Sequence, residues 1–112
     1  MREWSVRRFV TGSCDVSVIE TVTFRLAADT DEAEFLAADR RVQTEFLYHQ
    51  PGLVRRTTAR DRDGGWIVIV LWRSESDADA AATLSEDDRP TSELVAMLDG
   101  TTVETRRYAT LD

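Results

Sequence analysis

The sequence contains no lysine and no asparagine, and it has one cysteine and one histidine. The single cysteine, Cys14, cannot form a disulfide within the chain, and a structural zinc site built from several thiolates is excluded. The single histidine, His49, likewise excludes a metal site of several histidines in one chain. The missing asparagine removes one kind of catalytic amide side chain. No phosphate-binding glycine loop is present either, so we expect no metal and no cofactor.

Long hydrophobic runs are also absent. The longest apolar run, Trp66 to Trp72, is far shorter than the roughly 20 residues that a membrane-spanning helix needs. The charged N-terminal residues have no apolar stretch behind them, so we expect no secretory signal and a cytoplasmic location. The formal net charge of −7 argues against nucleic-acid binding, which depends on clustered positive charge.

The length of 112 residues fits one domain. Gly12 and Ser13 interrupt the pattern early, so we divide the chain into residues 1–15, an N-terminal arm or an extra strand, and residues 16–112, the folded domain. No internal repeat or low-complexity linker divides this domain further.

Alternating hydrophobicity and turn residues predict the elements of that domain. The first strand carries Glu20 on its apolar face, and Pro51 with Gly52 ends the first helix. Asp63 and Gly64 form a turn between two antiparallel strands. The predicted order is a strand at 16–26, a helix from about 30 to 49, strands at 53–60 and 66–73, helices at 77–84 and 90–98, and a strand at 101–108.

The strand that starts at Trp66 is apolar on both faces, with Trp66, Val68, Val70 and Trp72 on one and Ile67, Ile69 and Leu71 on the other. One face can pack on the domain's own helices, and the other needs a second cover. The order therefore predicts an α+β, ferredoxin-like βαββαβ fold: a four-stranded antiparallel sheet with helices on one face. A second copy on the open face would make a homodimer, a dimeric α+β barrel.

Three segments resemble a known family: Val18 to Leu26, Gln50 to Arg56, and Gly65 to Ser74 followed by an acidic, alanine-rich helix. They are similar to the dimeric α+β barrel superfamily, and most of all to its antibiotic-biosynthesis-monooxygenase-type domains. The resemblance implies cofactor-independent oxidation, haem degradation or isomerisation as possible activities, because members of the superfamily differ in reaction.

The resemblance carries one position over. In these enzymes a tryptophan before a basic residue and a serine, at the end of the third strand, faces the cleft between sheet and helices; here this is Trp72. The haem-degrading members also use an asparagine on the first strand and a histidine on the second helix, and this chain has neither. The quinol-oxidising members also use asparagine, which puts that activity in doubt too.

The residues themselves sketch an aromatic cleft around Trp72. Glu20 and His49 are the candidate bases, and with Trp72 they form the candidate catalytic set. Pairing across the turn is expected to bring Arg55 and Thr57 to the same face. Arg55, Trp66 and Phe46 are the candidate substrate-binding residues.

Each candidate also has a structural interpretation. Glu20 can pair with Arg55 or Arg106 across strands, and the helix dipole alone favours His49 at a helix C-terminus. Asp39, on the apolar stripe of the first helix, can pair with Arg40 or Arg41.

Three hypotheses about function remain open. The first is a homodimer that binds an aromatic or polyketide-type small molecule and oxidises it without a cofactor, with Glu20 or His49 removing a phenolic proton. The second is a non-catalytic ligand-binding or dimerisation module. The third is a small isomerase or decarboxylase that uses the same cleft. An enzyme should have a cleft lined by Trp72, whereas a module should fill that space with Phe35, Phe46 and Leu94.

Overall fold

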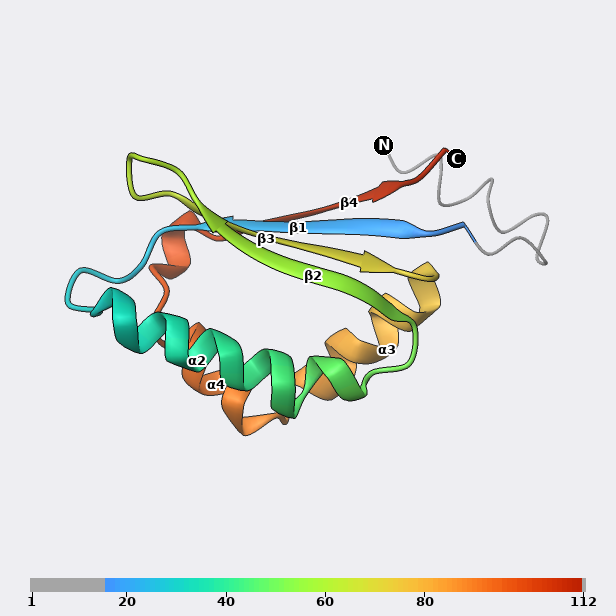
Figure 1. Ribbon diagram of the computed structural model, residues 1–112, viewed down its shortest axis with the longest axis horizontal. Helices are drawn as coiled ribbons and strands as arrows, with labels where there is room; N and C mark the ends of the chain where they lie inside the picture. Colours follow the sequence, from blue (N-terminus) through green and yellow to red (C-terminus); the bar gives the residue numbers. More distant parts are fainter. Residues whose placement is uncertain (1–15, 112) are drawn as a thin grey trace.

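The computed structural model describes residues 16–111. The expected N-terminal arm or strand at 1–15, with Cys14, lies outside the described residues. The described part forms one sheet with all its helices on one face (Figure 1), and the predicted ferredoxin-like α+β fold is confirmed. The elements are β1 (Val18–Phe24), α2 (Glu32–Glu45), η1 (Leu47–His49), β2 (Leu53–Arg60), β3 (Trp66–Trp72), α3 (Glu75–Ser85), α4 (Arg89–Val95), η2 (Gly100–Thr102) and β4 (Glu104–Ala109).

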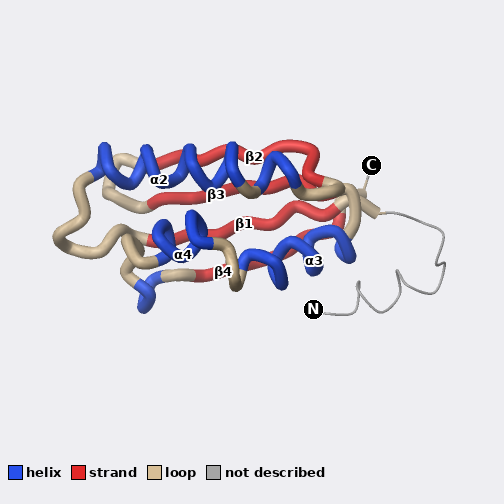
Figure 2. Tube along the Cα trace, turned by 90° about the horizontal axis from the view of Figure 1, so that it is seen from below, coloured by secondary structure: helices blue, strands red, loops and turns tan. Residues whose placement is uncertain are grey.

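The four strands lie in the order β2-β3-β1-β4, and every neighbouring pair is antiparallel. Seen from the helix side, α2 runs along β2 and β3, whereas α4 and α3 follow one another along β1 and β4 (Figure 2). The helices therefore form two rows over the sheet.

The core lies between the sheet and the helices. Alternation along β3 buries Trp66, Val68, Val70 and Trp72, because these four side chains point toward the helices. Phe35 from α2 is fully buried, and its ring lies 4.8 Å from that of Trp66. The aromatic core is therefore concentrated at the hairpin end of the sheet, under α2.

The β2–β3 hairpin turns where the sequence predicted. Gly64 has a φ of +86°, a conformation that glycine adopts without steric cost. The Asp61 carboxylate accepts backbone hydrogen bonds from Gly65 and Asp63, at 2.8 and 2.7 Å. These bonds hold the pKa of Asp61 below its usual range, because they stabilise the ionised form.

The predicted first helix is shorter in the structure. Its α-helical part ends at Glu45, Phe46 leaves helical geometry with a φ of −124°, and a 3₁₀ turn follows from Leu47 to His49. The tighter turn brings the chain round to Pro51, which cannot continue a helix. His49 is consequently exposed and lies in the 3₁₀ turn that follows α2.

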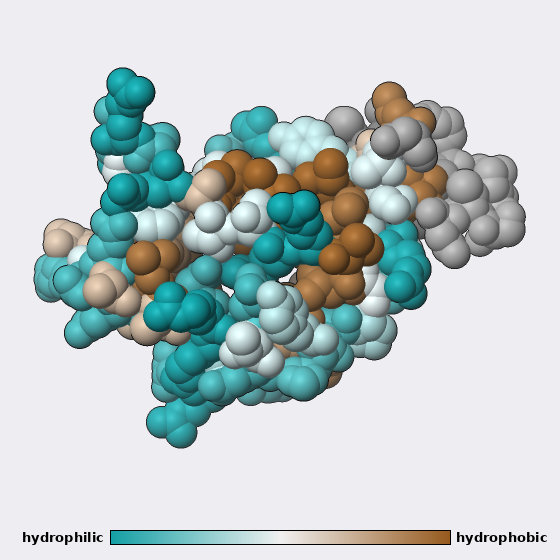
Figure 3. Space-filling view, in the orientation of Figure 1, coloured by the Kyte–Doolittle hydropathy of each residue, from teal (hydrophilic) through white to brown (hydrophobic). Residues whose placement is uncertain are grey.

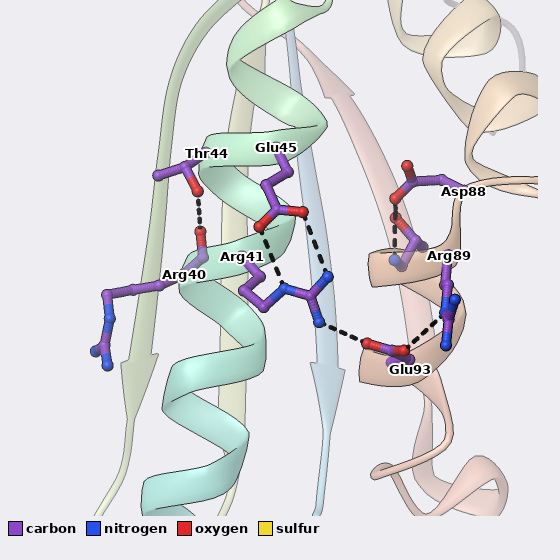
Figure 4. A network of polar contacts seen from close by, with 8 residues as sticks. Arg40, Arg41, Thr44, Glu45, Asp88, Arg89 and Glu93 are labelled. Atoms are coloured by element: carbon purple, nitrogen blue, oxygen red, sulfur yellow. Dashed lines mark hydrogen bonds and ion pairs between the residues drawn. The ribbon is translucent and has the colours of Figure 1, made fainter.

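Polar contacts connect the two rows of helices. Glu93 of α4 accepts hydrogen bonds from Arg41 of α2 at 2.7 Å and from Arg89 at 3.2 Å (Figure 4). Arg41 also pairs with Glu45, one turn further along α2. These hydrogen bonds lower the pKa of Glu93 and raise that of Arg41.

Candidate functional site

An open cleft of about 590 Å³ lies between the sheet and α3. Its floor comes from β1, β3 and β4, and α3 covers this half of the sheet (Figure 2). Leu47 of η1 forms part of the opposite wall. The residues that line it are Glu20, Val22, Leu47, Trp72, Ala78, Ala81, Ala82, Ser85, Thr105, Arg106 and Arg107.

The composition of α3 explains why a cleft exists here. Ser74 caps the helix by accepting a hydrogen bond from the Asp77 amide at 3.2 Å. The residues that α3 turns toward the sheet include Ala78 and Ala81, both buried. An alanine side chain is a single methyl group, so this helix covers the sheet without filling the space beneath it.

Glu20 and Trp72, both predicted from the sequence, meet in this cleft. The indole Nε1 of Trp72 donates a hydrogen bond to Oε1 of Glu20 at 3.3 Å. Trp72 is 2% exposed, and the Glu20 side chain is 18% exposed. A half-buried carboxylate beside an aromatic wall is the kind of polar group that orients a small ligand.

Arg107 of β4 completes the group. It lies opposite Glu20 in the β1–β4 register, and its Nε donates to Oε2 of Glu20 at 3.1 Å. Its other end reaches α3, where it donates to Asp79 at 2.5 Å and lies 3.8 Å from Glu75. Burial alone would lower the pKa of Arg107, but the hydrogen bond to Asp79 and the charge of Glu20 outweigh burial and raise it. The guanidinium is therefore permanently charged.

Arg55 does not belong to this site. The β2–β3 register runs without a break from the hairpin, where Arg60 pairs with Trp66, and it pairs Arg56 with Val70 and Arg55 with Leu71. Neighbouring residues in a strand point to opposite faces. Arg55 and Thr57 therefore lie on the open face of the sheet, and the prediction that they share the face of Trp72 was wrong.

The remaining predicted residues lie apart from the cleft. Phe46 is buried in the core, and His49 is exposed at the end of η1; neither is among the described residues that line the cleft. Trp66 sits at the far end of β3, next to two hollows around the β2–β3 hairpin. The guanidinium of Arg60 lies 5.7 Å from its ring.

Asp39 has a structural role, but not with the predicted partners. Its carboxylate accepts hydrogen bonds from Arg56 at 2.7 Å and from the Thr58 hydroxyl at 2.8 Å. The network joins α2 to β2 where the Arg56 and Asp39 side chains are buried, and a buried charge needs a partner. The register of β2 makes it possible, because Arg56 pairs with Val70 and so points toward the helices.

The sequence did not identify Arg107 as a site residue. Arg107 is a basic residue in the last predicted strand, next to a second arginine. The sequence does not give the register of this strand against β1, so it could not show that Arg107 lies opposite Glu20. Arg106, named as a possible partner for Glu20, instead pairs with Glu104 at 2.7 Å.

Among the described residues, no group of histidine, cysteine, aspartate and glutamate side chains has the arrangement of a metal site. None of the described helices is both long and apolar enough to cross a bilayer.

Solved structures share this fold. A mutant form of SnoaB, described as a cofactor-independent oxygenase from Streptomyces nogalater, matches with a TM-score of 0.72 and 24% identity, over 88% of this chain and 96% of SnoaB. Rv0793 from Mycobacterium tuberculosis matches with a TM-score of 0.64 and 17% identity, over 86% of this chain and 96% of that one.

A Chloroflexus aurantiacus protein, named after antibiotic biosynthesis monooxygenases, matches with a TM-score of 0.62 and 11% identity, over 86% of this chain and 94% of its own. No family model and no curated protein sequence matches the chain. At these identities the likeness concerns the fold: the chain has the α+β fold of antibiotic-biosynthesis-monooxygenase-type domains.

Proposed function

We propose that the chain acts as a homodimer that binds an aromatic, polyketide-type small molecule in the cleft under α3 and oxidises it with dioxygen, without a cofactor. The observation that carries this proposal is the cleft itself, with Trp72 and Glu20 in its lining. Phe35, Phe46 and Leu94, which would fill it in a packed module, are absent from the lining and belong to the rest of the core. SnoaB, a cofactor-independent oxygenase, has the same fold.

The proposed reaction starts with removal of a proton from an acidic phenol or methylene group of the substrate by Glu20. Dioxygen then adds to the resulting carbanion, and the peroxide that forms takes a proton. When the reacting carbon is a methylene, loss of water from this hydroperoxide leaves a carbonyl. One oxygen atom thus ends in the product and the other leaves in water. The cleft contributes by holding the ring beside Trp72, close to the Glu20 carboxylate.

Homodimerisation is proposed from the open face of the sheet. Ile19, Ile67, Ile69 and Leu71 share this face and remain partly exposed. A band of hydrophobic side chains follows the sheet in Figure 3. A second copy would remove this face from water, which is the main driving force for such association.

Oxidation of a substrate panel tests the proposal. The protein is first treated with a chelator that removes metal ions. It is then incubated with a set of anthrones and quinols, in air and under nitrogen, and the product is followed by absorbance. We expect oxygen-dependent turnover, and a loss of about 100-fold or more in kcat/KM for Glu20→Gln. Trp72→Phe should lose activity as well. Glu45→Gln, an exposed carboxylate on α2, is the matched control. A wild type that is inert towards the whole panel contradicts the proposal.

A second candidate function, a non-catalytic ligand-binding module, is favoured by one observation. Both oxygens of Glu20 already accept hydrogen bonds, from Trp72 and from Arg107, so the carboxylate is engaged in contacts that hold the walls of the cleft together. In that case the panel members should bind, as seen by quenching of tryptophan fluorescence, but none should be oxidised.

A further inference from the structure

Arg107 links the parts of the cleft. It pairs with Glu20 on β1, and with Asp79 and Glu75 on α3. Its side chain is only 21% exposed, so these charges act on one another with less screening than surface charges do. The arrangement holds the guanidinium between the floor and the roof of the cleft.

The two oxygens of Glu20 are not held equally. Oε2 accepts from Arg107 at 3.1 Å, as part of an ion pair. Oε1 accepts from the neutral Trp72 indole at 3.3 Å, which is long for an N–H···O bond. Oε1 is therefore the oxygen that can take a proton at the smaller cost, while Oε2 stays against the guanidinium.

Proton transfer to Oε1 changes what Arg107 neutralises. Before the transfer, the guanidinium faces an ionised Glu20. Afterwards Glu20 is a neutral acid, and the negative charge lies on the substrate oxygen in the same cleft. We propose that Arg107 serves as the counter-ion in both states, pairing first with Glu20 and then with the substrate oxyanion. This inference rests on the proposed function.

The step balances without a further reactant. The O–H bond of the substrate phenol breaks, its electron pair stays on the phenolate oxygen, and the proton bonds to Oε1 of Glu20. The net charge of the cleft does not change. A cation that is already in place needs no reorganisation when the charge moves, which is why fixed charges stabilise such anions effectively.

The negative charge of Asp79 partly neutralises Arg107 and so reduces the positive potential that Arg107 exerts in the cleft. The Asp79 side chain is 65% exposed, so the pair with Arg107 adds little to stability. The pair nevertheless holds one end of the guanidinium against α3. Replacing Asp79 with asparagine should leave the fold intact and release more of the positive charge to the cleft.

The test uses 2-hydroxyanthraquinone, a tricyclic phenol that is already oxidised and changes colour when its hydroxyl ionises. Its dissociation constant is measured by tryptophan fluorescence, and the pKa of the bound phenol by absorbance titration. Relative to wild type, Arg107→Gln should raise that pKa by about one unit or more. Arg107→Lys should restore most of the effect, and Asp79→Asn should lower the pKa of the bound phenol further.

The two proposals fail in different ways. If the probe binds but ionises equally in wild type, Arg107→Gln and Asp79→Asn, the counter-ion role is overturned, while the binding site stands. If the wild type does not bind the probe at all, the proposed function fails and this inference fails with it. Asp79→Asn keeps the test decisive if Arg107→Gln does not fold.

Discussion

Asp39 of α2 and Arg56 of β2 form an ion pair of 2.7 Å, with the two side chains only 10% and 4% exposed. Burial removes the hydration of both charges, and the ion pair compensates for that loss. Thr58 and Gln43 add hydrogen bonds to the same pair. The network is a buried polar contact between α2, the longest of the described helices, and the edge strand β2.

Removing one charge of this pair should destabilise the protein more than removing both. We expect Arg56→Met to lower the free energy of unfolding by about 3–5 kcal/mol, because a buried carboxylate is left without a partner. The double variant with Asp39→Leu should recover most of the loss. Urea unfolding of the four proteins in a double-mutant cycle measures this coupling. Additive losses would contradict the prediction.

Gly52 should not tolerate a side chain. Its φ of +85° disfavours other residues, and a β-carbon there would collide with the Asp77 side chain. We expect Gly52→Ala to cost about 1–3 kcal/mol in the free energy of unfolding. Gly100→Ala is the control, because a β-carbon at Gly100 would meet no atom within 4 Å. Similar losses in both variants would speak against this explanation.

Glu93 should make stability depend on pH in the acid range. Hydrogen bonds from Arg41 and then Arg89 lower its folded pKa below the ordinary 4.5. A carboxylate with a lowered folded pKa stabilises the fold above its unfolded pKa, and the contribution disappears as pH falls through the folded value. Chemical unfolding from pH 7 to 3 should therefore show Glu93→Gln less stable than wild type above pH 4.5, with a gap that closes below it.

High salt provides the control for this effect. The ion pairs of Glu93 with Arg41 and Arg89 are exposed, so added salt should screen them. The stability difference between wild type and Glu93→Gln at neutral pH should then become smaller. A gap that is constant from pH 7 to 3 would mean that the Gln variant perturbs packing and not charge.

The open face of the sheet should control assembly. We expect the wild type to be a dimer and Ile69→Glu, which places a charge in the middle of the apolar face, to be monomeric. Sedimentation equilibrium at micromolar concentration measures this. Val95→Glu, at an exposed apolar position on α4, should leave the dimer unchanged. A wild type that is monomeric under these conditions overturns the dimer.

The order of the elements could be predicted because each element has its own local signal. Alternation defines β1 and β3, Ser74 starts α3, and Gly64 with Asp63 turns the hairpin. Glu20 and Trp72 could be placed on one face for the same reason, since both lie on strands with an unbroken period of two.

The rest of the site depended on features that leave little trace in the sequence. The faces of Arg55 and Arg56 are set by the hairpin register, in which the Asp61 amide bonds to the Gly65 carbonyl. A register that differed by one residue would exchange them, and the turn residues Asp63 and Gly64 do not by themselves fix it. His49 is exposed because the chain leaves α2 through a 3₁₀ turn on its way to β2, and this turn depends on where β2 lies in the folded domain. Arg107 depends on the register between β1 and β4, two strands that are far apart in the chain.

The cleft under α3 exists because the alanine side chains on that face of the helix are small. The sheet beneath it has the same alternation and burial that any packed domain would have. A single larger residue at Ala81 could fill the hollow without disturbing a strand, and a smaller one elsewhere could enlarge it. In such a scaffold, a single substitution is enough to change the size of the ligand that the proposed site accepts, or to close the site.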